Sequence, residues 1–287
     1  MTMTEQLNAL GSILAQGSLH SLFQPIICLS ERRILGYEAL SRGPSNSPLH
    51  SPVALFSVAS HAGRLSELDM ACRESACRRF SEQKLPGKLF LNISPGSLME
   101  NAHQPGRTLQ LLRDFGISPS QVVIELTEQA PTDDFALLQT ALHHYRDMGF
   151  AIALDDLGAG YSSLRLWSEL RPDYVKIDRH FIDGIHQDAL KREFVGSILQ
   201  IARASRAQVI AEGIELPEEL AVLTEMGVDL VQGYLLCRPQ EKPPQEARLM
   251  LPKPDNATLA LNDEGSDLSA LLNEPPAVDQ DTATAQV

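Results

Sequence analysis

The sequence predicts an α/β fold, a TIM-like (β/α)8 barrel with one antiparallel strand. Eight short β-rich runs are spread over about 250 residues, a chain length that suits such a barrel. Helical patterns separate the runs after the second, and alternation of strand and helix implies parallel pairing through crossovers. The first two runs are joined only by the segment SERR (30–33), which is too short for a crossover helix. Strands 1 and 2 should therefore form an antiparallel hairpin.

The expected elements follow one another in a regular order. The expected strands are 22–29, 34–40, 89–94, 122–127, 151–157, 174–178, 208–214 and 230–236. The expected helices are 51–63, 66–82, 107–115, 133–148, 189–204 and 217–226. The clearest helix, 133–148, repeats apolar residues at i, i+3, i+7 and i+10 from Phe135, and Gly149 suits its C-terminal cap.

Composition and charge exclude several classes of protein. The 287 residues carry 24 Lys and Arg against 37 Asp and Glu, a net charge of −13, and 43% are hydrophobic, which indicates a mostly globular chain. No apolar run reaches the roughly 18 residues of a membrane-spanning helix, and the N-terminus lacks the features of a signal peptide. The cysteines have no metal-finger spacing and indicate reduced, buried thiols in a cytoplasmic protein: Cys28, Cys72, Cys77 and Cys237. A secreted disulfide scaffold, a membrane protein and a binder of nucleic-acid polymers are therefore excluded.

The charge pattern predicts two parts, a barrel over residues 1–252 and a tail over residues 253–287. The tail has one Lys against seven Asp and Glu, 1 − 7 = −6, which is nearly half of the net charge. It contains Pro254, Pro275 and Pro276 and no aromatic residue, so it has too little apolar surface to offset chain entropy. We expect an acidic linker or disordered tail, beyond which a further regulatory domain can follow.

Most of the expected strands carry a polar, usually acidic, residue near the carboxyl end. In chain order these residues are Glu38, Asn92, Glu125, Asp155, Asp156, Lys176, Glu212 and Gln232. A barrel brings these ends together on one face, where the active sites of this architecture lie. Converging carboxylates repel one another unless cations balance them, and hard oxygen ligands suit Mg²⁺ or Mn²⁺. Two such ions about 3.5–4 Å apart form the clamp used for in-line attack at phosphorus, so the pattern predicts phosphoester hydrolysis.

Each of these residues also has a simpler interpretation. A single Glu at a strand end is more often a helix cap or an ion-pair partner, although eight such coincidences in one ring are hard to accept. Lys176 can be a surface side chain, or it can orient or deprotonate a water or stabilise charge on a phosphate. The adjacent Asp155 and Asp156 can serve two ions only if the strand end bulges so that both side chains face the pocket. His143 and His144 are expected in solvent, and no zinc-protease, serine-hydrolase or phosphate-loop pattern occurs.

Several ordered motifs make the chain resemble a known family. They are FQPI (23–26), YEALSR (37–42), LNIS (91–94), ELTE (125–128), DDLGAGYSS (155–163), KID (176–178), EGIE (212–215) and QGY (232–234). Together they resemble the EAL domain of bacterial phosphodiesterases, which open cyclic di-GMP to the linear dinucleotide pGpG. The resemblance runs from about Leu22 to Pro239 and does not rest on one short motif.

The resemblance implies a role for each matched residue. One metal ion would be held by Glu38, Asn92, Glu125 and Asp155. Asp155 would bridge to a second ion that Asp156 also binds. The catalytic residues would be Lys176, in contact with the attacking water, together with Glu212 and Glu38. Substrate would be bound by Gln24, by Gln232 and by Arg42, which would grip a phosphate. Glu128 would brace the loop after Asp156.

The resemblance also implies cofactors and partners. It predicts two Mg²⁺ or Mn²⁺ ions, cyclic di-GMP as substrate and a homodimer. Two positions depart from the family pattern, Leu157 in place of Phe and Leu216 in place of Thr, and neither removes a metal ligand. The leading hypothesis is a metal-dependent phosphodiesterase. A cyclic di-GMP receptor that is inhibited or does not hydrolyse its ligand is the alternative, and an unrelated barrel enzyme such as a metal-dependent aldolase is a third hypothesis.

Overall fold

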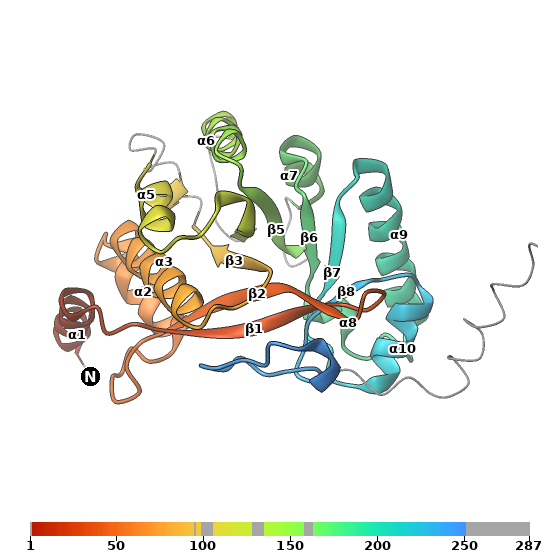
Figure 1. Ribbon diagram of the computed structural model, residues 1–287, viewed down its shortest axis with the longest axis horizontal. Helices are drawn as coiled ribbons and strands as arrows, with labels where there is room; N and C mark the ends of the chain where they lie inside the picture. The colour runs from red at the N-terminus through yellow and green to blue at the C-terminus, as the bar shows by residue number, and fades with distance from the viewer. Residues whose placement is uncertain (1, 95, 99–105, 128–134, 158–162, 251–287) are drawn as a thin grey trace, which may run out of the picture. The chain divides into compact units, whose positions relative to one another are not determined.

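The computed structural model describes residues 2–94, 96–98, 106–127, 135–157 and 163–250. In this part of the chain eight strands form a closed barrel in chain order (Figure 1). They are β1 (His20–Cys28), β2 (Arg33–Arg42), β3 (Lys88–Asn92), β4 (Val122–Thr127), β5 (Ala151–Leu157), β6 (Tyr174–Ile177), β7 (Gln208–Ala211) and β8 (Leu230–Val231).

β1 is the strand that runs against all the others. It pairs antiparallel with β2 and with β8, whereas the pairs from β2 to β8 are parallel. The turn between β1 and β2 spans only residues 29–32, so the chain must reverse directly into a hairpin. The predicted TIM-like barrel with strands 1 and 2 as a hairpin is therefore confirmed.

Helices surround the barrel and connect its parallel strands (Figure 1). The six helices that the sequence predicts are present, with ends within two residues of those expected. They are α2 (Pro52–His61), α3 (Leu65–Glu82), α5 (Arg107–Asp114), α6 (Phe135–Asp147), α9 (Ala189–Ser205) and α10 (Pro217–Glu225). His143 and His144 are exposed on α6, as predicted.

In the described ranges the structure also contains helices that the sequence analysis did not predict, among them α1 (Met3–Gln16), α7 (Ser163–Leu170) and α8 (Arg179–Ile182). α1 starts with a capping box between Thr2 and Glu5, a pattern that could have revealed it. Its residues Leu10 and Ile13 are buried in an apolar cluster with α2 and α3. α7 and α8 have only eight and four residues, too few for a clear helical period.

β7 and β8 are shorter than predicted, because the backbone leaves the sheet at two glycines. β7 ends at Ala211, and Gly213 then takes a positive φ of 69°. β8 ends at Val231, and Gly233 packs directly on the loop after β7. A Cβ on Gly233 would lie 2.1 Å from the carbonyl oxygen of Ile214, so only glycine permits this approach.

The barrel is filled by its own side chains. One apolar cluster lines the lumen and consists of Ile26, Cys28, Leu35, Phe90, Val123, Ala153, Tyr174, Ile210 and Leu230. Phe90 and Tyr174 meet edge to face in it, with ring centroids 5.5 Å apart. A larger cluster packs the outer faces of the strands against the helices. Because the lumen is closed, a ligand site in the barrel must lie at one of its ends.

Some predictions concern residues outside the described part of the chain. These are the tail 253–287, the loop residues 158–162 and Glu128. The four cysteines are all buried and form no disulfide, in agreement with the prediction. Within the described ranges, no helix has the length and apolar character needed to cross a membrane.

Candidate metal centre

Strand periodicity gathers the predicted polar residues at one end of the barrel. Side chains alternate between the two faces of a strand, so a residue two positions after an inward-facing one also faces inward. In six strands an apolar lumen residue is followed two positions later by a polar residue. The pairs are Phe90–Asn92, Val123–Glu125, Ala153–Asp155, Tyr174–Lys176, Ile210–Glu212 and Leu230–Gln232. A polar ring therefore lies directly above the apolar lumen.

Lys176 is at the centre of this ring. Its side chain is 1% exposed, which excludes the alternative of a surface lysine. The Nζ atom lies 2.7 Å from Glu212 Oε1, 2.9 Å from Glu125 Oε1, 3.2 Å from Asp155 Oδ1 and 3.4 Å from Glu38 Oε2. Burial lowers the pKa of Lys176, but attraction to the four carboxylates outweighs burial and raises that pKa well above its ordinary value. The side chain is therefore a buried cation.

The ring carries more negative charge than Lys176 can balance. The four carboxylates and the lysine sum to −4 + 1 = −3 when all are ionised. Glu125 is fully buried, and its Oε2 atom has no hydrogen-bond partner. Burial raises the pKa of Glu125 well above its ordinary value, and the attraction of Lys176 only partly offsets this. An unpartnered buried carboxylate oxygen in an acidic ring fits a divalent cation that prefers oxygen ligands.

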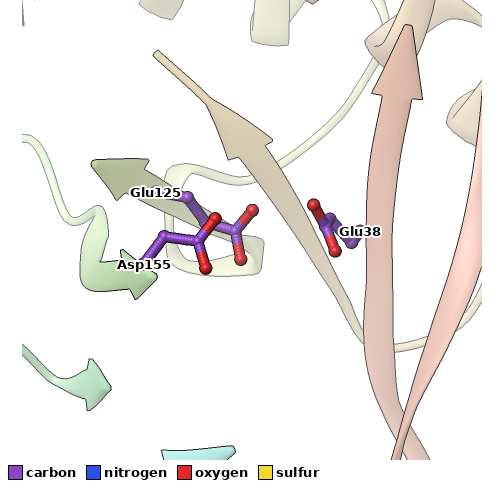
Figure 2. Close-up of side chains that lie close together, drawn as sticks. All are labelled: Glu38, Glu125 and Asp155. Atoms are coloured by element: carbon purple, nitrogen blue, oxygen red, sulfur yellow. The ribbon is translucent and has the colours of Figure 1, made fainter. Parts of the chain in front are cut away.

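The carboxylates form two overlapping groups, each able to surround one cation. Glu38, Glu125 and Asp155 offer oxygens within 4.8 Å of one another, and Figure 2 shows their carboxylates converging from β2, β4 and β5. The second group consists of Asp155, Asp156 and Glu212, which also offer oxygens within 4.8 Å of one another. Asp155 belongs to both groups. The site therefore offers two neighbouring sets of oxygen ligands that share one aspartate.

A bulge at the end of β5 brings both adjacent aspartates to the site. Leu154 pairs with Val175 and Leu157 with Ile177, so three steps along β5 match two steps along β6. Within the bulge Asp156 has a positive φ of 55°. Burial, followed by repulsion from Asp155, raises the pKa of Asp156 to about 6. The bulge that the sequence reasoning required is therefore present.

Two amide side chains hold Glu38 from either side. Asn92 donates from Nδ2 to Glu38 Oε1 at 3.1 Å, and Gln232 donates from Nε2 to Glu38 Oε2 at 2.8 Å. The Oε1 atom of Gln232 is buried and has no hydrogen-bond partner. The amide groups thus orient a carboxylate of the first ligand group and offer additional oxygen ligands.

A cavity of about 270 Å³ opens above these groups. Gln24 lines it, and its Nε2 atom donates to the carbonyl oxygen of Cys237 at 3.1 Å. Arg42 lines a second cavity of about 180 Å³, and Leu40 lines both cavities. The structure thus brings the predicted metal-binding and catalytic residues together and puts Arg42 beside them in the adjoining cavity.

Four residues with polar side chains line the main cavity but received no role from the sequence. They are Asp178, Arg179, Glu215 and Tyr234. Asp178 and Glu215 stand two and three positions after Lys176 and Glu212, so the same strand ends could have indicated them. Arg179 Nη1 and Glu215 Oε1 form an ion pair at 3.0 Å across the rim.

The fold and the site define a class: a (β/α)8-type barrel protein with an acidic site, able to hold a divalent cation, at the carboxyl ends of its strands. A family model described as EAL domain matches residues 6–239. The chain therefore belongs to the EAL domain family.

Known proteins similar to this chain agree with this assignment. "Cyclic di-GMP phosphodiesterase PdeF" of Escherichia coli strain K12 is 34% identical over 198 residues, which cover 68% of this chain and 26% of the relative. A manganese and cyclic di-GMP complex of Klebsiella pneumoniae BlrP1 has a TM-score of 0.72 at 31% identity, covering 78% of this chain and 56% of that one. A standalone EAL protein from Vibrio cholerae O395, in its c-di-GMP bound form, has a TM-score of 0.71 at 30% identity, covering 79% of this chain and 95% of that one. The chain spans about a quarter of the length of PdeF.

Proposed function

We propose that this chain is a metal-dependent phosphodiesterase that hydrolyses cyclic di-GMP to linear pGpG in bacterial second-messenger signalling. The observation that carries the proposal is the pair of carboxylate groups that share Asp155. The names of the similar proteins support it, because PdeF is called a cyclic di-GMP phosphodiesterase and the BlrP1 structure is titled as a complex with manganese and cyclic di-GMP. An aldolase-like barrel enzyme has no comparable support.

The donor set fits two Mg²⁺ or Mn²⁺ ions. The first would be held by Glu38, Glu125 and Asp155, with Asn92 as an amide ligand, and the second by Asp155, Asp156 and Glu212. Such ions, when bound, activate a water for attack and offset charge on the attacking and leaving oxygens. The protein contributes the spacing of the two ligand groups, which the bulge at Asp156 fixes.

Lys176 and Glu212 would orient and deprotonate the attacking water. Lys176 is a buried cation with its Nζ atom 2.7 Å from Glu212, so it can donate a hydrogen bond to the water and stabilise charge on the phosphate. Glu212 is a carboxylate that can accept the proton of the water. The new bond forms between the water oxygen and phosphorus, the bond to the 3′ oxygen breaks, and that oxygen leaves with a proton as the 3′ hydroxyl. The phosphate stays on the 5′ end of the product.

Three residues would position the substrate. Arg42 would bind a phosphate through its planar, bidentate guanidinium, and Gln24 and Gln232 would offer amide groups at the cavity wall. Glu128 would brace the loop after Asp156. A homodimer and a regulatory domain beyond the tail belong to the same proposal.

The decisive experiment follows pGpG by chromatography after incubating the purified chain with cyclic di-GMP. Parallel reactions contain Mg²⁺, Mn²⁺ or EDTA, and a second set measures ligand binding with Ca²⁺. We expect metal-dependent formation of pGpG that EDTA abolishes. Saturable binding without product would favour the receptor alternative, and the absence of both binding and product would refute the proposal.

A further inference from the structure

Glu219 is a buried carboxylate that joins two loops next to the metal centre. Its side chain lies in the first turn of α10 and the residue is 1% exposed. Oε1 accepts the backbone N–H of Gly184 at 2.9 Å, and Oε2 accepts those of Glu215 and Leu216, each at 3.0 Å. Burial raises the pKa of Glu219, but these three hydrogen bonds outweigh burial and lower the pKa below its ordinary value. The carboxylate is therefore an anion held by backbone donors.

The two loops follow two strands that contribute different residues to the polar ring. Gly184 belongs to the connection that follows β6 and α8, and β6 holds Lys176. Glu215 and Leu216 belong to the connection that follows β7, whose end carries Glu212. The shortest contact of the ring, 2.7 Å between Lys176 Nζ and Glu212 Oε1, thus spans the two strands whose loops Glu219 joins.

The other edge of the loop after β7 is fixed independently. Ile214 donates its N–H to the carbonyl oxygen of Gln232 at 3.3 Å and accepts the N–H of Leu235 at 3.0 Å. These bonds connect the loop after β7 to the end of β8, whereas the hydrogen bonds of Glu219 connect the same loop to the segment at Gly184 that follows β6 and α8. At the start of α10, Glu219 stands at the third helical position and accepts the N–H of the N-cap residue Leu216, as the acidic residue of a capping box does.

We infer that Glu219 is a positioning residue that sets the spacing between Lys176 and Glu212 and thereby the geometry of the second ligand group. The inference rests on the proposed function for its effect on turnover. Residues that orient metal ligands typically change metal affinity or activity by about 10–100-fold when they are replaced. Glu219 acts here through backbone amides and contacts neither ion nor substrate.

Glu219→Gln and Glu219→Ala test the inference, with Glu218→Gln as the matched control. Glu218 is exposed in the same turn of α10. Glutamine keeps the shape but has only one acceptor oxygen, so it cannot serve both Gly184 and the loop after β7. Metal-stripped protein is titrated with Mn²⁺ and followed by its melting temperature. The kcat and KM for cyclic di-GMP are then measured well below that temperature, per folded protein.

We expect Glu219→Gln to raise the half-saturating Mn²⁺ concentration and to lower kcat by about tenfold each, with a larger loss in Glu219→Ala and no change in Glu218→Gln. KM should change less than kcat, because Arg42 and Gln24, proposed to bind the substrate, lie outside the two loops that Glu219 joins. A lower melting temperature with unchanged Mn²⁺ titration and kcat would overturn the inference and leave Glu219 a purely structural cap. If the wild type binds Mn²⁺ but makes no pGpG, the proposed function fails, and the Mn²⁺ titrations still decide the role of Glu219.

Discussion

Replacing Lys176 with methionine removes the buried cation while keeping a side chain of similar length. Four carboxylates, at 2.7–3.4 Å from Nζ, then face one another without the cation that balances their charge. Removing one partner of a buried ion pair costs about 3–5 kcal/mol in the free energy of unfolding. For a domain of this size that corresponds to a fall in Tm of about 6–20 °C without metal.

The loss should depend on pH. Burial already raises the pKa of Glu125 above its ordinary value with Lys176 present, and removal of the cation raises it further. A carboxyl whose pKa is raised in the folded state contributes stability at low pH that is lost as pH rises through the folded pKa. The fall in Tm should therefore be larger at pH 8 than at pH 5. Added Mn²⁺ should restore more stability to the variant than to the wild type, because it supplies the missing positive charge.

The assay compares melting curves of Lys176→Met, wild type and Lys242→Met in EDTA and in Mn²⁺ at both pH values. Lys242 is exposed, so its variant controls for the loss of a lysine charge as such. We expect turnover to fall about 10²–10³-fold in Lys176→Met while cyclic di-GMP still binds. A Tm within 2 °C of the wild type in EDTA at pH 8, on the scale of roughly 2–4 °C per kcal/mol, would refute the view of Lys176 as the counter-ion of the ring.

Four more predictions concern single residues of the barrel and the acidic tail. Glu38→Ala should abolish pGpG formation even in excess Mg²⁺, because it removes a ligand of the first group; near-normal turnover would contradict that role. Gly233→Ala should lower Tm, because the added Cβ would lie 2.1 Å from the backbone oxygen of Ile214. Gly196→Ala is the control: an added Cβ at this position in α9 meets no atom within 4 Å, so the substitution should stabilise the protein by about 0.5–1 kcal/mol. Burial raises the pKa of Asp229, but hydrogen bonds from the β1–β2 turn outweigh burial and lower that pKa below its ordinary value. The stability that Asp229 contributes should therefore be full above the unfolded pKa of about 4 and be lost as pH falls. Asp229→Asn should make Tm depend less on pH in this acidic range. Truncation after Pro252 should leave Tm nearly unchanged, and a large fall would show that the tail packs on the barrel.

Much of the fold could be predicted because its signals are local. The strands 122–127 and 151–157 match β4 and β5 to the residue, since continuous aliphatic runs mark buried parallel strands. The reversed first strand followed from the length of one connection. The ends of β7 and β8 could not be predicted, because Gly213 and Gly233 end them through a contact between distant segments.

The features of the site likewise divide into those that the sequence indicated and those that depend on tertiary contacts. Their position near the carboxyl ends of the strands indicated that polar side chains such as Glu125 and Asp155 gather at the same end of the barrel. The sequence did not reveal that Lys176 touches four carboxylates, because those contacts exist only when the barrel closes. It also gave no sign of Glu219, since its three donors come from two loops that meet only in three dimensions.

The amino-acid sequence by itself determined which residues are polar at each strand end and that the first two strands form a hairpin, because strand period and loop length are properties of neighbouring residues. Only the tertiary structure decided which carboxylate oxygens lie close enough to hold one cation, that the bulge turns Asp156 into the cavity, and that Lys176 is a buried counter-ion. The physical reason is distance: electrostatic coupling and metal ligation depend on separations of a few ångströms between side chains that the sequence keeps far apart.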